Sequence, residues 1–282
     1  MNNENFRKSV VHAFNRMPAL ATSDRIDPES LKNNTITPNA FASASKDYTY
    51  YEGLAAYTDG DNFDEALAAE CKAAAIDELT AAGATFPVKM LMCYKPTSAN
   101  WAQECQVVEQ QIEAVLGADY VDIIIQAGPE TGFLGAIRRT GKYAFMKCNW
   151  GADYADPETW TDPFSTDSSY SFIFKSTDPE TQALYAEYAE LVAAAKAITD
   201  DMDARYTAFA KAEAFLLDHA FAVPFSISNR SYQMCNLNVF EGQYASFGMA
   251  NQRYKDQHLY DTSMGLEEYQ AAYAEWQSKK AG

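Results

Sequence analysis

Hydrophobic residues recur at helical spacing near the start of the chain. Apolar side chains stand at positions 6, 10, 13, 14 and 17, which share one face of a helix. Pro18 is expected to end this helix, because proline lacks the N–H that would continue the hydrogen-bond ladder. From about residue 21 to 61 the chain is polar and interrupted by prolines and a glycine. We expect long loops with short helical turns there.

A strand–helix–strand pattern follows. An amphipathic helix is predicted from Asp61 to Ala82, with Gly83 as its C-cap. The sequence then predicts a strand at 87–94, a helix from about 98 to 116 and a strand at 120–126. This order indicates a right-handed βαβ unit with parallel strands, and therefore an α/β fold.

The rest of the chain carries further helical periods and two shorter strand patterns. Strands are predicted at 143–149 and 222–227, and helices at 178–197, 201–220 and 266–279. A loop rich in Asp, Pro, Ser and aromatic residues follows the first of these strands. The segment before the last helix is irregular and polar, and no internal repeat is present.

The composition indicates a folded protein and argues against nucleic-acid binding and membrane spans. The 282 residues are 48% hydrophobic, which is enough for one large domain or two modest ones with a packed core. The net charge of −17 favours solubility and makes nucleic acid an improbable partner. No apolar run reaches the roughly 18 residues that span a bilayer, and the first residues lack the features of a signal peptide. Met1 either begins a cytoplasmic protein or was added to a fragment.

Motifs for nucleophilic, metal or phosphate chemistry are missing from the sequence. Its five cysteines form no C-x-x-C pair, so neither a zinc site nor a disulfide framework is predicted. The three histidines, His12, His219 and His258, are far apart and are interpreted as structural. We therefore predict no metal and no cofactor.

One segment does bring an aromatic residue and an anion together. Trp150 follows the predicted strand at 143–149, and Asp153 comes three residues later. A carboxylate beside an aromatic wall suits a cationic group such as a free ammonium. Two alternatives stay open. Asp153 and Asp156 could be the acid and base of a glycosidase, or Trp150 could be core while one of the two carboxylates caps the turn before Pro157.

The same segment carries a family resemblance. Residues 149–157 (NWGADYADP) resemble the W-x-x-D-Y-x-D-P segment of the oligopeptide- and dipeptide-binding proteins of ABC importers. Residues 5–16 are similar to that family's N-x-x-x-R-x-A-x-x-x-A-x-D-R helix, with Ser9 and Asn15 as departures. Residues 102–125 resemble a helix and strand of its second lobe. The stretch from Arg205 through Glu213 to Pro224 resembles the family's R-x-x-x-Y helix, which ends in a Pro-led strand. These four stretches follow one another in the family's order.

The resemblance implies the second lobe of a two-lobed, periplasmic-binding-protein-like (type II) fold. Residues 1–232 are expected to form this ligand-binding lobe. Residues 233–282 are expected to be a crossover segment and terminal helix that pack on a first lobe missing from this chain. The full-length protein would then carry an export signal, often a lipoprotein one, and work outside the cytoplasm.

The resemblance also implies a function. The protein would be the substrate-binding component of an ABC importer, not an enzyme, capturing peptides between two lobes and delivering them to a membrane permease. Asp153 would pair with the peptide's α-amino group and Trp150 would wall the pocket, with Tyr154 as the third expected ligand-binding residue. No residue is assigned to the peptide's carboxylate end. The alternatives are a metal chelate, haem or an oligosaccharide as ligand, or a carboxylate-dependent glycoside hydrolase.

Overall fold

The computed structural model describes residues 1–165, 170, 173, 175–227, 235–241 and 254–280. The chain divides into two compact units. The larger unit consists of residues 1–150 and 156–228, and the smaller unit of residues 151–155 and 229–282. The predicted boundary between residues 232 and 233 lies outside the described residues, so the division into lobes stays a prediction.

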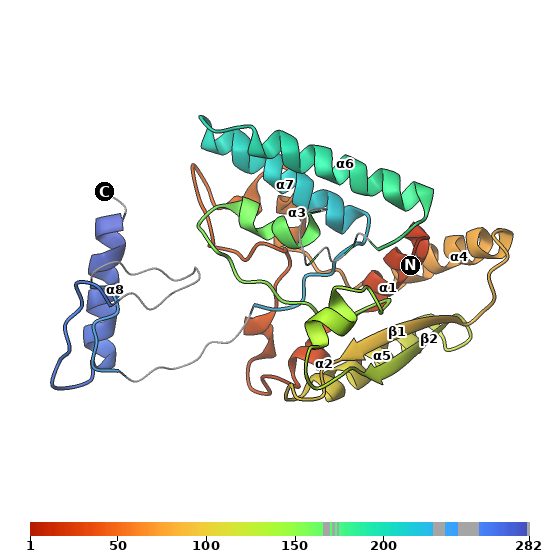
Figure 1. Ribbon diagram of the computed structural model, residues 1–282, viewed down its shortest axis with the longest axis horizontal. Coiled ribbons are helices and arrows are strands. Elements are labelled where there is room, and N and C mark those ends of the chain that lie inside the picture. Colours follow the sequence, from red (N-terminus) through yellow and green to blue (C-terminus); the bar gives the residue numbers. More distant parts are fainter. Residues whose placement is uncertain (166–169, 171–172, 174, 228–234, 242–253, 281–282) are drawn as a thin grey trace. The chain divides into compact units, whose positions relative to one another are not determined.

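A parallel βαβ unit forms one side of the larger unit. Strand β1 (Val88–Tyr94) leads through helix α5 (Trp101–Leu116) to strand β2 (Val121–Ala127). The two strands pair in parallel, in a register that begins with Val88 opposite Val121. Figure 1 shows both strands lying against α5. The predicted parallel strand–helix–strand unit is confirmed.

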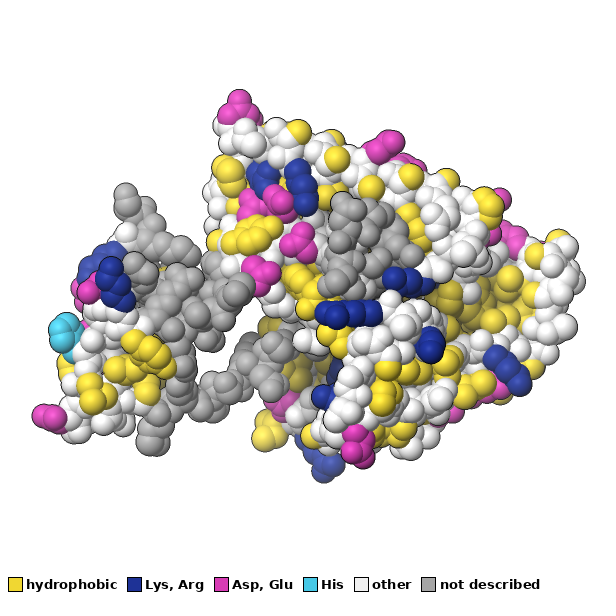
Figure 2. Space-filling model, in the orientation of Figure 1, with side chains coloured by type: hydrophobic (Ala, Val, Ile, Leu, Met, Phe, Trp, Pro, Cys, Tyr) yellow, Lys and Arg dark blue, Asp and Glu magenta, His cyan; other side chains and the backbone are white. Residues whose placement is uncertain are grey.

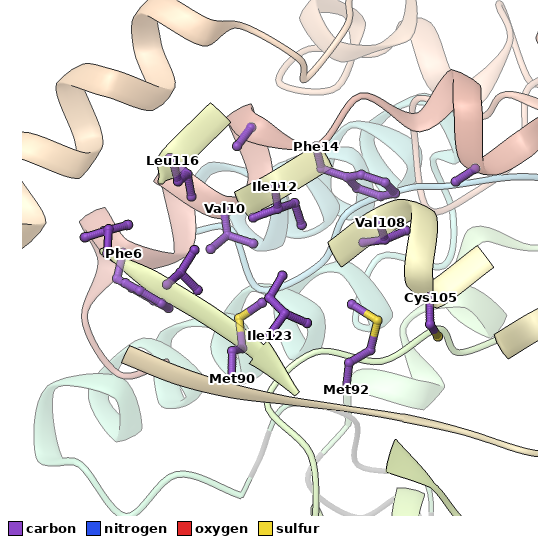
Figure 3. Close-up of a cluster of buried hydrophobic side chains, with 14 of the residues drawn as sticks. Phe6, Val10, Phe14, Met90, Met92, Cys105, Val108, Ile112, Leu116 and Ile123 are labelled. Atoms are coloured by element: carbon purple, nitrogen blue, oxygen red, sulfur yellow. The ribbon is translucent and has the colours of Figure 1, made fainter. Parts of the chain in front are cut away.

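The core of this side joins the first helix to the βαβ unit. Phe6 and Val10 of α1 (Glu4–Ala13) pack with Ile112 of α5 and Met90 of β1, and Figure 3 shows their side chains converging. These four side chains are at most 1% exposed. Burying one such side chain contributes about 1.5–3 kcal/mol, so this contact stabilises the packing of α1 on the βαβ unit.

Polar side chains cap the starts of four of the described helices. The N-cap side chain accepts a hydrogen bond from a backbone N–H of the first turn, as capping requires. This holds for α1 (capped by Asn3), α4 (Glu65–Ala81, capped by Asp64), α6 (Pro179–Lys196, capped by Asp178) and α7 (Met202–Asp218, capped by Asp201).

Helix α4 ends at the predicted glycine. Gly83 has a φ of +79°, its N–H donates to the carbonyl of Thr80, and the N–H of Ala84 donates to the carbonyl of Leu79. These two bonds satisfy carbonyls that the end of the helix leaves unpaired, and they need a residue in the left-handed conformation. Gly83 is thus the left-handed residue that closes the helix, one position after the C-cap Ala82.

The predicted end of the first helix is wrong. α1 ends at Ala13, and a second helix, α2 (Arg16–Leu20), begins three residues later with Asn15 as its cap. Pro18 lies in the first turn of α2, where its missing N–H would have no helical partner. Proline therefore helps to begin a helix here.

Two predicted strands are also wrong. Within 143–149 a single parallel bridge joins Phe145 to Met92, and within 222–227 a single antiparallel bridge joins Ser226 to Lys32. The apolar residues of both segments pack on the core that includes α1 and α5. Their apolar character thus reflects packing on this core, without a strand ladder.

A second core lies beneath the α6–α7 pair. Figure 1 shows these two helices side by side, and residues of both contribute to a cluster with Tyr48, Tyr51 and Leu54. Short helical turns surround the two cores. They are η1 (Pro28–Leu31), η2 (Tyr48–Tyr50), α3 (Ala55–Thr58), the π-helical turn η3 (Leu134–Arg138), η4 (Pro157–Trp160) and η5 (Asp162–Phe164).

The smaller unit is built around an aromatic cluster on its helix. The ring of Phe240 lies 5.1 Å from that of Tyr269 and 5.5 Å from that of Tyr273, both on α8 (Leu266–Lys280). Leu237 and Leu259 form an antiparallel bridge within the same unit. The predicted terminal helix is confirmed. No helix among the described residues combines the length and apolar character of a membrane span.

Candidate functional site

The indole of Trp150 is fixed within the larger unit. Its Nε1–H donates to the carbonyl oxygen of Thr159 at 2.7 Å. The ring of Tyr170 meets it edge-on, with 4.9 Å between ring centroids. The side chain is partly buried, and the residue does not end a strand as predicted. Tryptophan here has both an apolar contact and a partner for its polar edge, so the orientation of the ring is defined.

Asp156 is committed to the structure on two sides. Its Oδ1 caps the turn η4 by accepting the N–H of Glu158 at 2.9 Å. Its carboxylate also accepts two hydrogen bonds from Arg205, Nε to Oδ2 at 3.0 Å and Nη2 to Oδ1 at 2.9 Å. The turn-capping interpretation of Asp156 is therefore correct. A carboxylate held by a guanidinium in this way is poorly suited to serve as a glycosidase acid or base.

Arg205 connects helix α7 to this turn. Besides Asp156 it binds Glu158, with Nη2 2.7 Å from Oε2, and its Nη1 donates to the carbonyl oxygen of Ile198 at 3.1 Å. Its guanidinium lies 4.8 Å from the ring centroid of Phe209, and the side chain is only 11% exposed. Hydrogen bonds to Asp156 and Glu158 raise the pKa of the guanidinium further. Charge and geometry together fix the start of η4 on α7.

The other two predicted site residues lie in the five-residue segment that belongs to the smaller unit. Asp153 and Tyr154 are both exposed, and 42% of Tyr154 is accessible. Trp150 belongs to the larger unit. A joint ligand site formed by Trp150, Asp153 and Tyr154 therefore stays a prediction.

Arg16 is a central residue to which the sequence assigned no role. It is 1% exposed, and its Nη1 donates to the carbonyls of Asn33 at 2.6 Å and Pro224 at 3.0 Å. Its Nη2 donates to the side chains of Asn34 and Asp61. Arg16 thus joins four separate segments of the larger unit. The only trace of this in the sequence is its place in the motif at 5–16.

The neighbouring cations lower the pKa of the Asp61 carboxyl. Partial burial alone would raise the pKa of its carboxyl, but hydrogen bonds from Lys32, the Phe63 N–H and Arg16 outweigh it and lower the pKa to about 2. The Lys32 ammonium lies 2.6 Å from Oδ2. Asp61 was predicted to begin a helix, yet α4 begins at Glu65 and Asp61 serves as an anchor for two cations.

Charge on the larger unit is mixed despite the acidic composition. Figure 2 shows Lys and Arg side chains lying among hydrophobic ones on this face, although the chain has a net charge of −17. Across the ranges that the structure describes, no group of three or more His, Cys, Asp or Glu side chains could hold a metal ion.

Relatives of known function cover almost the whole chain. Oligopeptide-binding protein AliA of Streptococcus pneumoniae is 29% identical over 314 aligned residues, which include 99% of this chain and 47% of AliA. Oligopeptide-binding protein SarA of Streptococcus gordonii is 26% identical over 99% of this chain and 46% of SarA. The chain is homologous to the oligopeptide-binding proteins. It spans about half the length of the curated relatives that it matches. No family model matches it.

Solved structures of peptide-binding proteins share the fold. A substrate-binding domain of an oligopeptide ABC transporter from Bacillus anthracis matches 92% of this chain and 46% of its own, with a TM-score of 0.67 and 22% identity. The pheromone receptor PrgZ matches 91% of this chain and 45% of its own, with a TM-score of 0.64 and 19% identity. The predicted fold class is confirmed: the chain has the mixed α/β fold of part of an oligopeptide-binding protein.

Proposed function

We propose that the full-length protein containing this chain is the substrate-binding component of an ABC importer. It captures peptides between two lobes outside the cytoplasm and delivers them to a membrane permease. The observation that carries this proposal is the match of oligopeptide-binding proteins to 99% of the chain. The protein acts by binding and is not an enzyme, in keeping with the names of those relatives.

Within this function, Asp153 receives the α-ammonium group of the peptide. Its side chain is exposed and so within reach of a ligand. Trp150 supplies an aromatic wall whose orientation is fixed by the bond to Thr159, and Tyr154 adds a second aromatic surface. A hydrogen bond between an ammonium and a carboxylate contributes about 1.5–3 kcal/mol. The remaining affinity would come from the extended peptide backbone, which gives loose side-chain specificity.

The structure does not support the glycosidase alternative, because Asp156 is bound by Arg205 and caps η4. The glycosidase hypothesis paired Asp153 with Asp156 as acid and base, so it loses one of its two carboxylates. Nor does any feature of the described residues favour a metal chelate, haem or an oligosaccharide over a peptide as the ligand.

Calorimetry on the full-length protein tests the assignment of Asp153. We compare one peptide with a free amino terminus and the same peptide N-acetylated. Asp153→Asn is expected to weaken binding of the free-amine peptide by about 10- to 100-fold, the loss of one charge-assisted hydrogen bond, and to change the acetylated peptide little. Asp77→Asn, on the exposed side of α4, is the control for a lost negative charge. Unchanged affinity of Asp153→Asn for the free-amine peptide would refute the role.

The present chain offers a second test. It represents about half of its relatives' length, so it supplies one wall of a two-lobed site. We expect it to bind peptide weakly or not at all when isolated. A submicromolar dissociation constant for the isolated chain would contradict the two-lobed mechanism.

A further inference from the structure

The segment that carries Asp153 is anchored at both ends to the larger unit. Residues 151–155 belong to the smaller unit, whereas Trp150 before them and Asp156 after them belong to the larger one. Both flanking residues make specific polar bonds within the larger unit. The conformations open to the five residues between them therefore depend on how firmly these two ends are held.

The two anchors share one platform, the turn η4. The indole of Trp150 donates to the carbonyl of Thr159, and the N–H of Thr159 donates to the carbonyl of Asp156 at 3.1 Å. Thr159 is fully buried. Residues 150–159 thus form a loop closed by hydrogen bonds at its base. Closing a loop at its base restricts its conformations and so lowers the entropy cost of ordering it on ligand binding.

Arg205 fixes this platform to helix α7. Its planar guanidinium grips Asp156 with two hydrogen bonds and reaches Glu158 with a third. The pair is shielded, because the Arg205 and Asp156 side chains are 11% and 19% exposed. Lysine has the same charge but offers no planar fork, so it could not reproduce this bidentate geometry.

We propose that Arg205 is a positioning residue for ligand binding. By holding Asp156 and Glu158 on α7, it keeps residues 151–155 in the conformation in which Asp153 receives the ligand's ammonium group. Arg205 acts through the loop and does not touch the ligand. This inference rests on the proposed function, since it assigns a second residue to the same site.

The test compares ligand discrimination with stability in the full-length protein. For each variant we measure the dissociation constants of a free-amine peptide and its N-acetylated form, together with thermal unfolding. Arg205→Gln and Arg205→Lys are expected to reduce the preference for the free amine by about tenfold, the value of one misplaced charge-assisted hydrogen bond. Affinity for the acetylated peptide is expected to change less than about twofold, since it does not use that bond. Lys211→Gln, on the same helix and paired with the exposed Glu52, is the matched control.

Combining variants separates the possible outcomes. In an Asp153→Asn background, Arg205→Gln is expected to have no further effect on the preference for the free-amine peptide. The reason is that both substitutions weaken the same interaction, the bond between Asp153 and the ligand's ammonium group. If Asp153→Asn lowers the preference but the Arg205 variants do not, the positioning role is wrong and the proposed function stands. If Asp153→Asn itself leaves the preference unchanged, the proposed site is wrong. An equal loss for both peptides would make Arg205 merely structural. Should Arg205→Gln not fold, Asp156→Asn weakens the same bond from the other side.

Discussion

Glu213 and Thr37 are 176 positions apart in the sequence and are joined by two hydrogen bonds. The backbone N–H of Thr37 donates to Oε1 at 3.0 Å, and its hydroxyl donates to Oε2 at 2.7 Å. The N–H of Ile36 and the hydroxyl of Tyr48 complete the set of donors around the carboxylate. Glu213 is 5% exposed. Burial raises the pKa of its carboxyl to about 7, even though these donors act in the opposite direction.

This burial predicts a pH dependence of stability. The folded state holds its proton up to about pH 7, whereas the carboxyl in the unfolded chain ionises near 4.5. Between these values the native state binds more protons, so stability falls as pH rises and is level above about 7. The full effect is about 3 kcal/mol. Glu213→Gln removes the titrating group and keeps its shape. Urea unfolding at pH 5 to 8 should show the wild type losing stability relative to this variant, and a constant difference would contradict the prediction.

Arg16 should be one of the most sensitive positions in the larger unit. Arg16→Met keeps the volume of the aliphatic stem but leaves the buried carbonyls of Asn33 and Pro224 without their donor. An unsatisfied buried acceptor costs about 1–3 kcal/mol, and we expect a total loss of about 2–4 kcal/mol in urea unfolding. Lys211→Met removes an exposed ion pair with Glu52 and is expected to change stability by less than about 1 kcal/mol. Equal effects of the two substitutions would refute the anchoring role.

Two isoleucines of opposite environment test the first core. Ile112 is 0% exposed and Ile26 is 95% exposed. Ile112→Ala is expected to cost about 2–5 kcal/mol, because it leaves a cavity between α1, β1 and α5. Ile26→Ala is expected to stay within about 0.5 kcal/mol of the wild type. Chemical denaturation measures the change in the free energy of unfolding for both variants. A loss below about 1 kcal/mol for Ile112→Ala would mean that this core is loosely packed.

A pair of glycines separates backbone conformation from packing. A Cβ at Gly83 or at Gly135 would meet no heavy atom within 4 Å, but only Gly83 has a positive φ, of +79°. Gly83→Ala is therefore expected to cost about 1–2 kcal/mol through backbone strain alone. Gly135→Ala is expected to be neutral or slightly stabilising, since alanine restricts the unfolded chain. Thermal unfolding of the two variants provides the comparison, and similar melting temperatures would contradict it.

Periodicity predicted the elements that are set by local sequence. The apolar spacing of α5 and α7 matches the burial that the structure shows. The run VDIII predicted β2, in which Val121 and Ile123 are buried and Ile124 is 40% exposed. The segments at 143–149 and 222–227 are also largely apolar, but they form one bridge each. Whether a one-sided apolar segment pairs with a neighbouring strand or only packs on helices depends on contacts distant in sequence. Periodicity contains no information about these contacts.

The candidate site was predictable only where it depends on local sequence. Trp150, Asp153 and Asp156 stand in one motif, and Arg205 in another, so the sequence indicated both segments. The bond between Arg205 and Asp156 spans 49 positions and no local pattern announces it. Glu213 likewise stood in a recognised motif, but its burial depends on Thr37 and Tyr48, which are more than 160 positions away in the sequence.

The route of the chain between the two units affects how relatives could be recombined. The chain leaves the larger unit after residue 150, returns at residue 156 and leaves again after residue 228. A chimaera with one junction near residue 228 would combine residues 229–282 of one parent with residues 151–155 of the other. The smaller unit would then be a hybrid of two sequences. A working exchange therefore requires three junctions, after residues 150, 155 and 228, and the carboxylate of Asp153 would be inherited together with the C-terminal segment.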